Sequence, residues 1–354
     1  MKILILTQKV DVNDDVLGFF HGWIEKFSEK FESVSVICLQ KGNYSFSNNV
    51  RVFSLGKEKG QSKIKYIYRF YKYIFSLRND YDVVFVHMNI EYVFLGGLFW
   101  RIMGKKIALW FAHKKGSFLR KVAVVLSHRI LSVSKESFVG SNNKKFRAMG
   151  HGINTEYFKC AELNLKPDRL KKIISIGRLS PVKGYDLLLN AIHHLVYKLN
   201  ETGFVVELIG GVANAEDVKY IEHLKDSVNH LKIEKNVVFK GPLANNKILP
   251  VLCSADIFVS MQCIGGAGKS FLEAMSCGIP TVVCTSVFNQ YWGKAEELFF
   301  YNGTEKDLAE KLQKCLNLSA EDRVAYSQLL RKIVMENHNL NNLIDKIKNE
   351  FVTL

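Results

Sequence analysis

Two cations stand in a short segment that follows a predicted buried strand in the second half of the chain. The segment IISIGRLSPVKGYDLLLNAI ends its strand at Gly177 and places Arg178 and Lys183 before a helix that begins near Gly184. In doubly wound α/β domains this turn binds phosphate, because the helix N-terminus adds positive potential. Arginine grips phosphate through two parallel hydrogen bonds, and lysine adds a point charge. The alternative is two solvated cations among the 49 lysines and arginines of the chain. Their position favours a phosphate site.

A second segment, CIGGAGKSFLEAMSCGIPTVV, has the same order of strand, glycine-rich loop and helix. It resembles the ATP-binding pattern G-x-x-x-x-G-K-[ST], but the first glycine of that pattern would fall at Cys263. We therefore do not expect an ATP-binding loop. Three glycines instead allow the backbone to approach a different ligand closely.

Glu273 lies one turn into the helix that follows this loop, and two interpretations are open. The segment from Ser270 to Glu273 fits a capping box, in which the glutamate accepts a hydrogen bond from the backbone N–H of Ser270. Alternatively, the carboxylate accepts a hydrogen bond from a sugar hydroxyl. A cap would explain the glutamate but not the glycine-rich loop.

The elements that must position these segments follow from the hydrophobic pattern. Strand-like runs alternate with amphipathic helices nearly throughout, as at 2–6 and 16–31. The alternation restarts after a polar stretch at 160–170, which we interpret as a linker. This pattern predicts an α/β protein with two doubly wound, Rossmann-like domains. We expect them to face each other across a cleft, with ligands at the carboxyl ends of the strands.

Composition limits the function further. The net charge of +15 indicates an anionic partner, but no zinc finger, RNP signature or basic heptad region points to nucleic acid. Seven cysteines without a C-x-x-C pair predict neither a zinc site nor disulfides, which favours a reduced cytosolic compartment. The longest apolar patch, 92–100, is too short to span a bilayer, so we expect a soluble protein.

Several segments together resemble the retaining glycosyltransferases of family 4, which have the GT-B fold. They are SIGRLSPVKGYDLLLNAI, the GP at 241–242, ADIFVS and GGAGKSFLEAMSCGIPTVV, with weaker likenesses in HGINTEYF and ENHNLNNL. The resemblance is strong in the second half of the chain and weak in the first. It implies a nucleoside-diphosphate sugar as donor substrate, with no metal and no other cofactor. It also implies domains at 1–160 (acceptor side) and 161–336 (nucleotide sugar), and a terminal helix at 337–354 that crosses back.

The resemblance assigns roles to individual residues. The candidate catalytic residues are Arg178, Lys183 and His113, of which the two cations bind the donor diphosphate. The candidate donor-binding residues are Gly177, Gly265, Gly266, Ala267, Gly268, Lys269, Ser270 and Glu273. Glu273 matches the family glutamate that bonds the ribose. One departure concerns Gly265, which stands where the family has a glutamate that contacts the donor sugar, so the identity of that sugar is open.

The acceptor side is less informative. Asp11, Asp14 and Asp15 follow the first predicted strand, but Val16 and Gly22 break the calcium-loop pattern. The loop is either a solvated acidic segment or a segment that binds the hydroxyl groups of the acceptor. His87 and His113 each end a predicted strand, and each either lines the cleft or is a buried structural histidine.

The predicted helix at 63–78 is both basic and aromatic. It is either an ordinary helix with one buried face or a helix that lies on an anionic membrane surface. A lipid-linked acceptor would explain why this helix lies on a membrane surface.

We therefore expect a retaining, metal-independent glycosyltransferase that moves a sugar to a glycan or lipid-linked acceptor in cell-surface polysaccharide or glycolipid synthesis. The expected location is cytoplasmic, with peripheral association at the inner face of the membrane as an open alternative. The rival interpretations are a non-catalytic sugar-nucleotide-binding protein and an epimerase or phosphorylase, each on the same fold.

Overall fold

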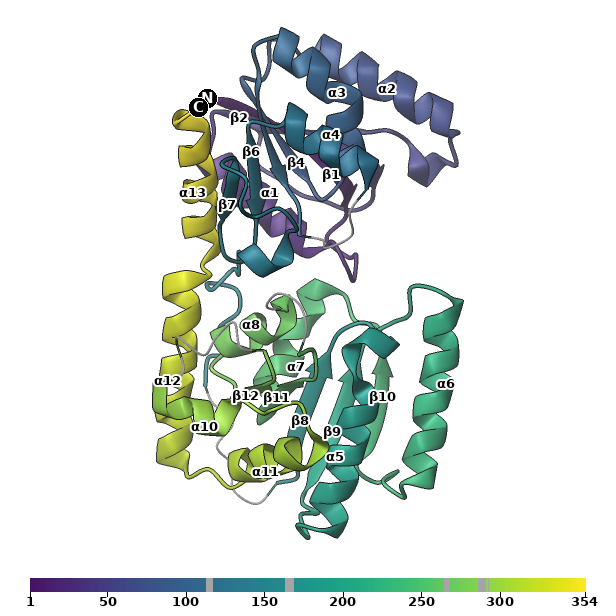
Figure 1. The fold of residues 1–354 in the computed structure, drawn as a ribbon, viewed down its shortest axis with the longest axis vertical. Coiled ribbons are helices and arrows are strands. Elements are labelled where there is room, and N and C mark those ends of the chain that lie inside the picture. Colours follow the sequence, from purple (N-terminus) through teal and green to yellow (C-terminus); the bar gives the residue numbers. More distant parts are fainter. Residues whose placement is uncertain (113–116, 163–168, 264–267, 286–290, 292) are drawn as a thin grey trace. The chain divides into compact units, whose positions relative to one another are not determined.

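The computed structural model describes residues 1–112, 117–162, 169–263, 268–285, 291 and 293–354. These residues form two compact α/β units (Figure 1). Unit 1 consists of Met1–Gly152, Ala244–Asn246 and Leu340–Leu354, and unit 2 consists of Ile153–Leu243 and Lys247–Asn339. Each unit has a parallel sheet, which confirms the predicted α/β class with two doubly wound units.

The sheet of unit 1 has the strand order β3-β2-β1-β4-β5-β6-β7, and every pair is parallel. The strands are β1 (Lys2–Val10), β2 (Ser33–Lys41), β3 (Val50–Ser54), β4 (Val83–His87), β5 (Lys106–Trp110), β6 (Arg129–Ser132) and β7 (Phe146–Ala148). The helices are α1 (Phe19–Lys30), α2 (Lys63–Ser76), α3 (Ile90–Ile102), α4 (Phe118–Leu126) and α13 (Leu340–Val352).

Both faces of this sheet are covered, which is why its central strands are apolar throughout. Side chains alternate between the faces. On one face Ile3 and Ile5 of β1 pack in a core with residues of α1 and α13. On the other face Leu4 and Leu6 pack in a second core with residues of α2, α3 and α4.

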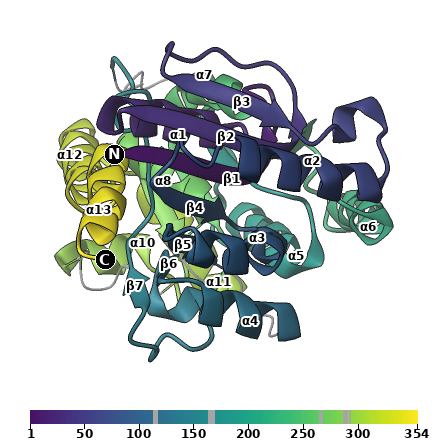
Figure 2. The ribbon, with the colours of Figure 1, turned by 90° about the horizontal axis from the view of Figure 1, so that it is seen from above.

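Helix α13 reaches unit 1 after the whole of unit 2 has intervened in the sequence, and it packs beside α1 (Figures 1 and 2). Its buried residues are Leu340, Leu343, Ile344, Ile347 and Phe351. Asp345 forms an ion pair with Lys30 of α1 at 2.9 Å, and Glu350 forms one with Arg129 of β6 at 2.6 Å.

The sheet of unit 2 has the order β10-β9-β8-β11-β12, again parallel. The strands are β8 (Lys171–Ile176), β9 (Phe204–Ile209), β10 (Val237–Gly241), β11 (Ile257–Ser260) and β12 (Thr281–Val283). The helices are α5 (Tyr185–Tyr197), α6 (Ala215–His230), α7 (Ile248–Ser254), α8 (Lys269–Ser276), α10 (Glu296–Phe299), α11 (Glu305–Leu316) and α12 (Ala320–Asn337).

Each sheet has a point where the strand order reverses. The reversal lies between β1 and β4 in unit 1 and between β8 and β11 in unit 2. Open α/β sheets bind their ligands outside the carboxyl ends of the strands at such a switch point. The turn with Arg178 follows β8, and the glycine-rich loop follows β11. Both predicted segments therefore meet at the switch point of unit 2.

The prediction that the cysteines form no disulfide is wrong. Cys160 is bonded to Cys253 and Cys263 to Cys284, with Cα atoms 5.5 and 4.7 Å apart. Cys263 and Cys284 follow the neighbouring strands β11 and β12, whose carboxyl ends share one edge of the sheet. Spacing along the sequence does not reveal that adjacency. The inference of a reduced compartment consequently loses its basis.

Within the described ranges, no helix combines the length and the apolar character needed to cross a membrane.

Candidate functional site

The turn after β8 brings the backbone of two strands into close contact. The N–H of Gly177 donates to the carbonyl oxygen of Ile209 at 2.9 Å, and the Tyr185 hydroxyl donates to the Gly177 carbonyl oxygen at 3.2 Å. A Cβ atom at Gly210 would collide with that same carbonyl oxygen. Glycine at position 210 therefore lets the carboxyl ends of β8 and β9 approach each other closely. This contact fixes the backbone at Gly177 and thus the direction in which the following residue, Arg178, projects.

Arg178 and Lys183 are placed as predicted, in the turn before α5. The Arg178 side chain is half exposed, and its Nε lies 3.9 Å from the Oδ2 of buried Asp217. Lys183 Nζ donates to the Oε1 of Gln262 at 2.6 Å. Burial lowers the pKa of Lys183, and the charge of Arg178 lowers it further. An anion bound between them would relieve this repulsion, because it would favour both charged forms.

Helix α8 begins at this switch point, directly after the glycine-rich segment. Its N-cap residue is Gly268 in an extended conformation, and no described side chain caps it. Ser270 Oγ donates to the Ile176 carbonyl oxygen at 2.9 Å, which ties the start of α8 to the end of β8. The unsatisfied N–H groups of a helix N-terminus favour an anionic ligand.

The predicted capping box, with Ser270 as N-cap, does not fit the observed helix start, because the N-cap residue of α8 is Gly268. Glu273 is 2% exposed and forms an ion pair with Lys269 Nζ at 3.1 Å. Burial lowers the pKa of Lys269, and Glu273 opposes that shift. The pair lies in the first two turns of α8, one helical turn apart.

Four predicted site residues lie outside the described residues: His113, Gly265, Gly266 and Ala267. Their roles stay predictions.

On the acceptor side, two of the three aspartates contact Lys9 of β1 or nearby backbone N–H groups. Lys9 Nζ donates to Asp14 Oδ2 at 2.6 Å and lies 3.5 Å from Asp11 Oδ2. Asp14 also accepts from the backbone N–H groups of Leu17 and Val16 at 2.6 and 3.0 Å. Burial raises the pKa of Asp14, but these hydrogen bonds outweigh it and leave that pKa lowered. Asp15 is exposed. The acceptor role of this loop stays a prediction.

His87 is buried, with 3% of its side chain exposed. Its ring stacks on Phe20 with the centroids 4.1 Å apart, and its Nδ1 lies 3.5 Å from the Thr7 hydroxyl. These contacts agree with the structural alternative for this histidine, although it ends β4 at the switch point of unit 1.

Sequence reasoning missed two residues that hold the cations, Gln262 and Asp217. Gln262 follows β11 by two positions, so a polar residue just beyond a strand at the switch point was an available signal. Asp217 lies in the first turn of α6 and accepts from the Ala213 N–H at 2.9 Å. Nothing in the sequence around Asp217 indicates that its side chain lies near Arg178.

A cluster of sulfur atoms lies at the far end of α8. The sulfurs of Cys160, Cys253 and Cys277 lie within 4.8 Å of one another. Since Cys160 and Cys253 are bonded to each other, they offer no thiolate to a metal in this structure.

Two sequence comparisons find known proteins that are similar to this chain. Residues 161–332 match the family model described as glycosyl transferases group 1. Mannosylfructose-phosphate synthase of Agrobacterium fabrum is 31% identical over 113 residues, which are 32% of this chain and 25% of that protein. Alpha-monoglucosyldiacylglycerol synthase of Streptococcus pneumoniae is 26% identical over 115 residues, or 32% of this chain and 24% of that protein. The match thus spans about a quarter of the length of these relatives.

Solved structures match along the whole chain. Anabaena Alr3699/HepE in complex with UDP has a TM-score of 0.75 at 16% identity, with 100% of both chains covered. Sucrose-phosphate synthase from Thermosynechococcus elongatus has a TM-score of 0.75 at 14% identity, with 100% of this chain and 99% of that chain covered. These likenesses confirm the GT-B fold. The match to the glycosyl transferases group 1 model covers residues 161–332, just under half of the chain, so the sequence similarity to that family concerns this part of the chain.

Proposed function

We propose that this protein is a retaining glycosyltransferase that moves a sugar from a nucleoside-diphosphate sugar to a glycan or lipid-linked acceptor. The pathway that we propose is the synthesis of a cell-surface polysaccharide or glycolipid. The observation that carries the proposal is the position of Arg178 and Lys183 at the switch point of unit 2, where α8 also begins.

The electrostatics of this site suit a departing diphosphate. As the bond between sugar and diphosphate breaks, negative charge develops on the leaving oxygen, and fixed cations stabilise it. Arg178 would hold the diphosphate through paired hydrogen bonds, and Lys183 would add its charge once an anion favours its protonated form. These two side chains supply positive charge from the protein itself, which is the basis for proposing that no metal is needed.

Retention of configuration would follow if the acceptor attacks on the face that the diphosphate leaves. The buried carboxylate of this site, Glu273, is ion-paired with Lys269 and lies on the helix whose N-terminus faces the loop. We assign it to the ribose of the donor rather than to the role of a nucleophile.

The nucleotide and the sugar of the donor are to be identified by experiment. We would screen UDP-, GDP- and ADP-sugars by thermal shift, and then measure binding of the selected nucleoside diphosphate by calorimetry. Arg178→Ala and Lys183→Ala should each weaken binding at least tenfold, because a charge-assisted hydrogen bond contributes about 1.5–3 kcal/mol. Release of nucleoside diphosphate from the sugar donor should fall by a similar factor.

Lys225→Ala is the matched control, since Lys225 is an exposed cation on α6 of the same unit. It should leave binding unchanged. Near-native binding and turnover in both site variants would overturn the assignment.

A second function has one observation in its favour. Gly265 replaces the family glutamate that contacts the donor sugar, so a non-catalytic sugar-nucleotide-binding protein is the rival. Tight donor binding with no release of nucleoside diphosphate, tested across the same panel and with mixed sugar acceptors, would favour that rival.

We also propose that unit 1 associates peripherally with an anionic membrane surface. Helix α2 buries Phe70 and Ile74, while Ile64 is 79% and Tyr68 68% exposed beside exposed lysines. Cations near an anionic surface contribute about 1 kcal/mol each. Flotation with phosphatidylserine vesicles should therefore show binding that weakens as salt rises, and no binding at low salt would remove this proposal.

A further inference from the structure

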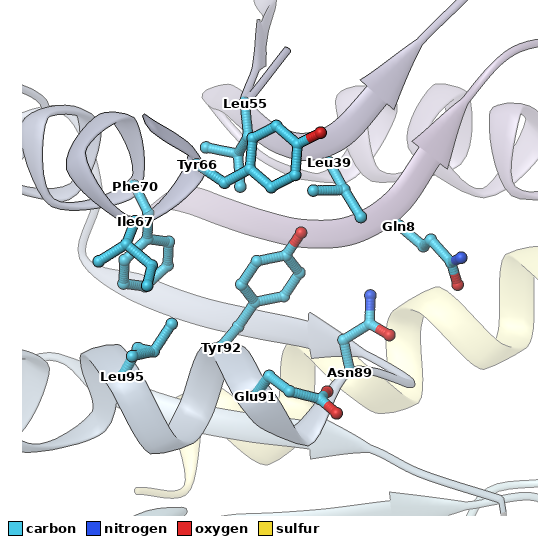
Figure 3. A pocket seen from close by; sticks show the side chains of 10 residues that line it. All are labelled: Gln8, Leu39, Leu55, Tyr66, Ile67, Phe70, Asn89, Glu91, Tyr92 and Leu95. Carbon is cyan, nitrogen blue, oxygen red and sulfur yellow. The ribbon is translucent and has the colours of Figure 1, made fainter. Parts of the chain in front are cut away.

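A cavity of about 260 Å³ opens in unit 1 between α2, α3 and the sheet (Figure 3). Ile67 and Phe70 of α2 line it from one side, and Tyr92 and Leu95 of α3 line it from the other. Phe70 and Tyr92 are nearly fully buried and stack with their centroids 5.7 Å apart, which gives the cavity a rigid aromatic wall. The walls therefore suit an apolar group.

The cavity has a polar end. Gln8 of β1 and Asn89 and Glu91 at the start of α3 are grouped there, away from the apolar walls (Figure 3). Asn89 occupies the N-cap position of α3, yet within the described residues its side chain makes no capping hydrogen bond. The amide that would ordinarily cap the helix is thus available to a ligand.

This polar end lies at the switch point of unit 1. Gln8 is two residues from the end of β1, and Asn89 is two residues beyond the end of β4. The apolar end runs back between the helices. A ligand that spans both ends must have a polar group at the carboxyl edge of the sheet and an apolar group beneath α2.

The size and charge of the cavity limit the class of ligand that it can bind. It is smaller than the roughly 300–1,000 Å³ of sites that enclose a whole drug-sized ligand, so it would take only part of one. Glu91 is the one charged residue among the described residues that line it, and a carboxylate at the mouth repels phosphate. The polar group should therefore be neutral and rich in hydroxyls.

We propose that this pocket binds the hydrocarbon chain of a glycolipid acceptor, with the neutral sugar of that acceptor at Gln8, Asn89 and Glu91. The proposal rests on the proposed glycosyl transfer and selects, within it, an acceptor in which a chain is attached directly to a sugar. Chain and sugar are bound by different ends of one pocket, so they can be tested separately.

The probes are hexyl, octyl and decyl β-D-glucoside, each below its critical micelle concentration, titrated by calorimetry. Burial of a methylene in an apolar site raises affinity about fourfold. Affinity should therefore climb steeply with chain length and then level off, once the chain fills the cavity. Partition onto an exposed apolar surface would show no such plateau.

Leu95→Trp fills the cavity and should abolish the dependence on chain length. Leu98→Trp is the matched control, because Leu98 lies one turn further along α3 and is 57% exposed. Asn89→Ala should weaken binding of octyl glucoside severalfold and leave binding of 1-octanol unchanged. If Leu95→Trp fails to fold by circular dichroism, Leu95→Phe replaces it.

No glucoside binding, or the same chain-length dependence in the wild type and the Leu95 variant, would overturn the pocket assignment. Nucleoside-diphosphate binding is measured on the same samples. Donor binding and turnover without glucoside binding would defeat this inference alone. Glucoside binding in a protein that binds no nucleoside diphosphate would defeat the proposed function and leave the chain-binding site standing.

Discussion

The switch points of the two units share one topology and differ in what their polar residues do. In unit 2 burial and the nearby charge of Arg178 lower the pKa of Lys183, and α8 begins beside these two cations. In unit 1 Asp11 and Asp14 of the loop after β1 are paired with Lys9 or with backbone N–H groups, and His87 is stacked in the core. The edge in unit 2 suits an anion, whereas these charged groups of unit 1 are paired with one another.

The difference teaches that strand order locates a candidate site but does not identify its chemistry. Cations that repel each other mark an edge that favours an anionic ligand. In unit 1 the binding capacity lies instead in the cavity between α2 and α3 and in the uncharged side chains at its polar end. The predictions that follow act on one unit and use the other as reference.

The largest expected effect is that of a reductant. The two disulfides both lie in unit 2, and Cys38 of unit 1 is a buried thiol. A disulfide that closes a loop of about 20 residues stabilises by about 3 kcal/mol. Dithiothreitol should therefore speed hydrogen exchange in β8–β12 and leave β1–β7 unchanged. An equal increase of hydrogen exchange in both units would contradict the prediction that disulfides stabilise unit 2 alone. So would the detection of seven free thiols in the protein without reductant.

Glu273→Gln should weaken binding of the nucleoside diphosphate at least tenfold, because it removes an ionised acceptor from a ribose hydroxyl. The variant also leaves Lys269 without its carboxylate partner, which costs stability. The nucleoside diphosphate is the right ligand for calorimetry, since it carries the ribose without the sugar.

Lys269→Met combined with Glu273→Gln separates the two effects. The double variant should recover thermal stability without recovering affinity. If affinity returns together with stability, the role of Glu273 is to hold the helix and not to bind the donor.

The smallest expected effect is that of Asp14→Asn in unit 1. The folded pKa of Asp14 lies below its ordinary value of 3.8, so its contribution is present above that value and is lost as pH falls through the folded pKa. The variant should lose about 1 kcal/mol of stability at neutral pH and flatten the acid limb of the stability curve. Donor affinity should not change. A tenfold loss of donor affinity would show that the two edges are not independent.

The elements with strong periodicity could be predicted from the sequence. The amphipathic pattern at 215–230 predicts the observed bounds of α6, and the pattern at 63–78 extends two residues beyond the end of α2. Strand β7 could not be predicted, because three residues at the edge of a sheet are too short to show a period.

In the site, the placement of Arg178 and Lys183 follows from local order along the chain, with a strand, a turn and a helix. The hydrogen bond from Lys183 to Gln262 joins residues far apart in the sequence, so the position of Gln262 beyond β11 could suggest a site residue but not this partner. The Lys269–Glu273 pair is different. Its i,i+4 spacing could be read from the sequence, but the predicted helix began at residue 270 and so left Lys269 outside it.

The path of the chain through unit 1 has a consequence for biosynthesis. Helix α13 supplies five residues, from Leu340 to Phe351, to a core whose other buried members lie before residue 150, and α13 leaves the ribosome only after unit 2. Nascent unit 1 therefore presents an uncovered apolar face while roughly half of the protein is still being made. Exposed faces of this kind recruit chaperones or aggregate. Ribosome stalling within unit 2 would thus yield an N-terminal fragment that precipitates, whereas the same fragment should be rescued by adding a peptide of residues 340–354 in trans.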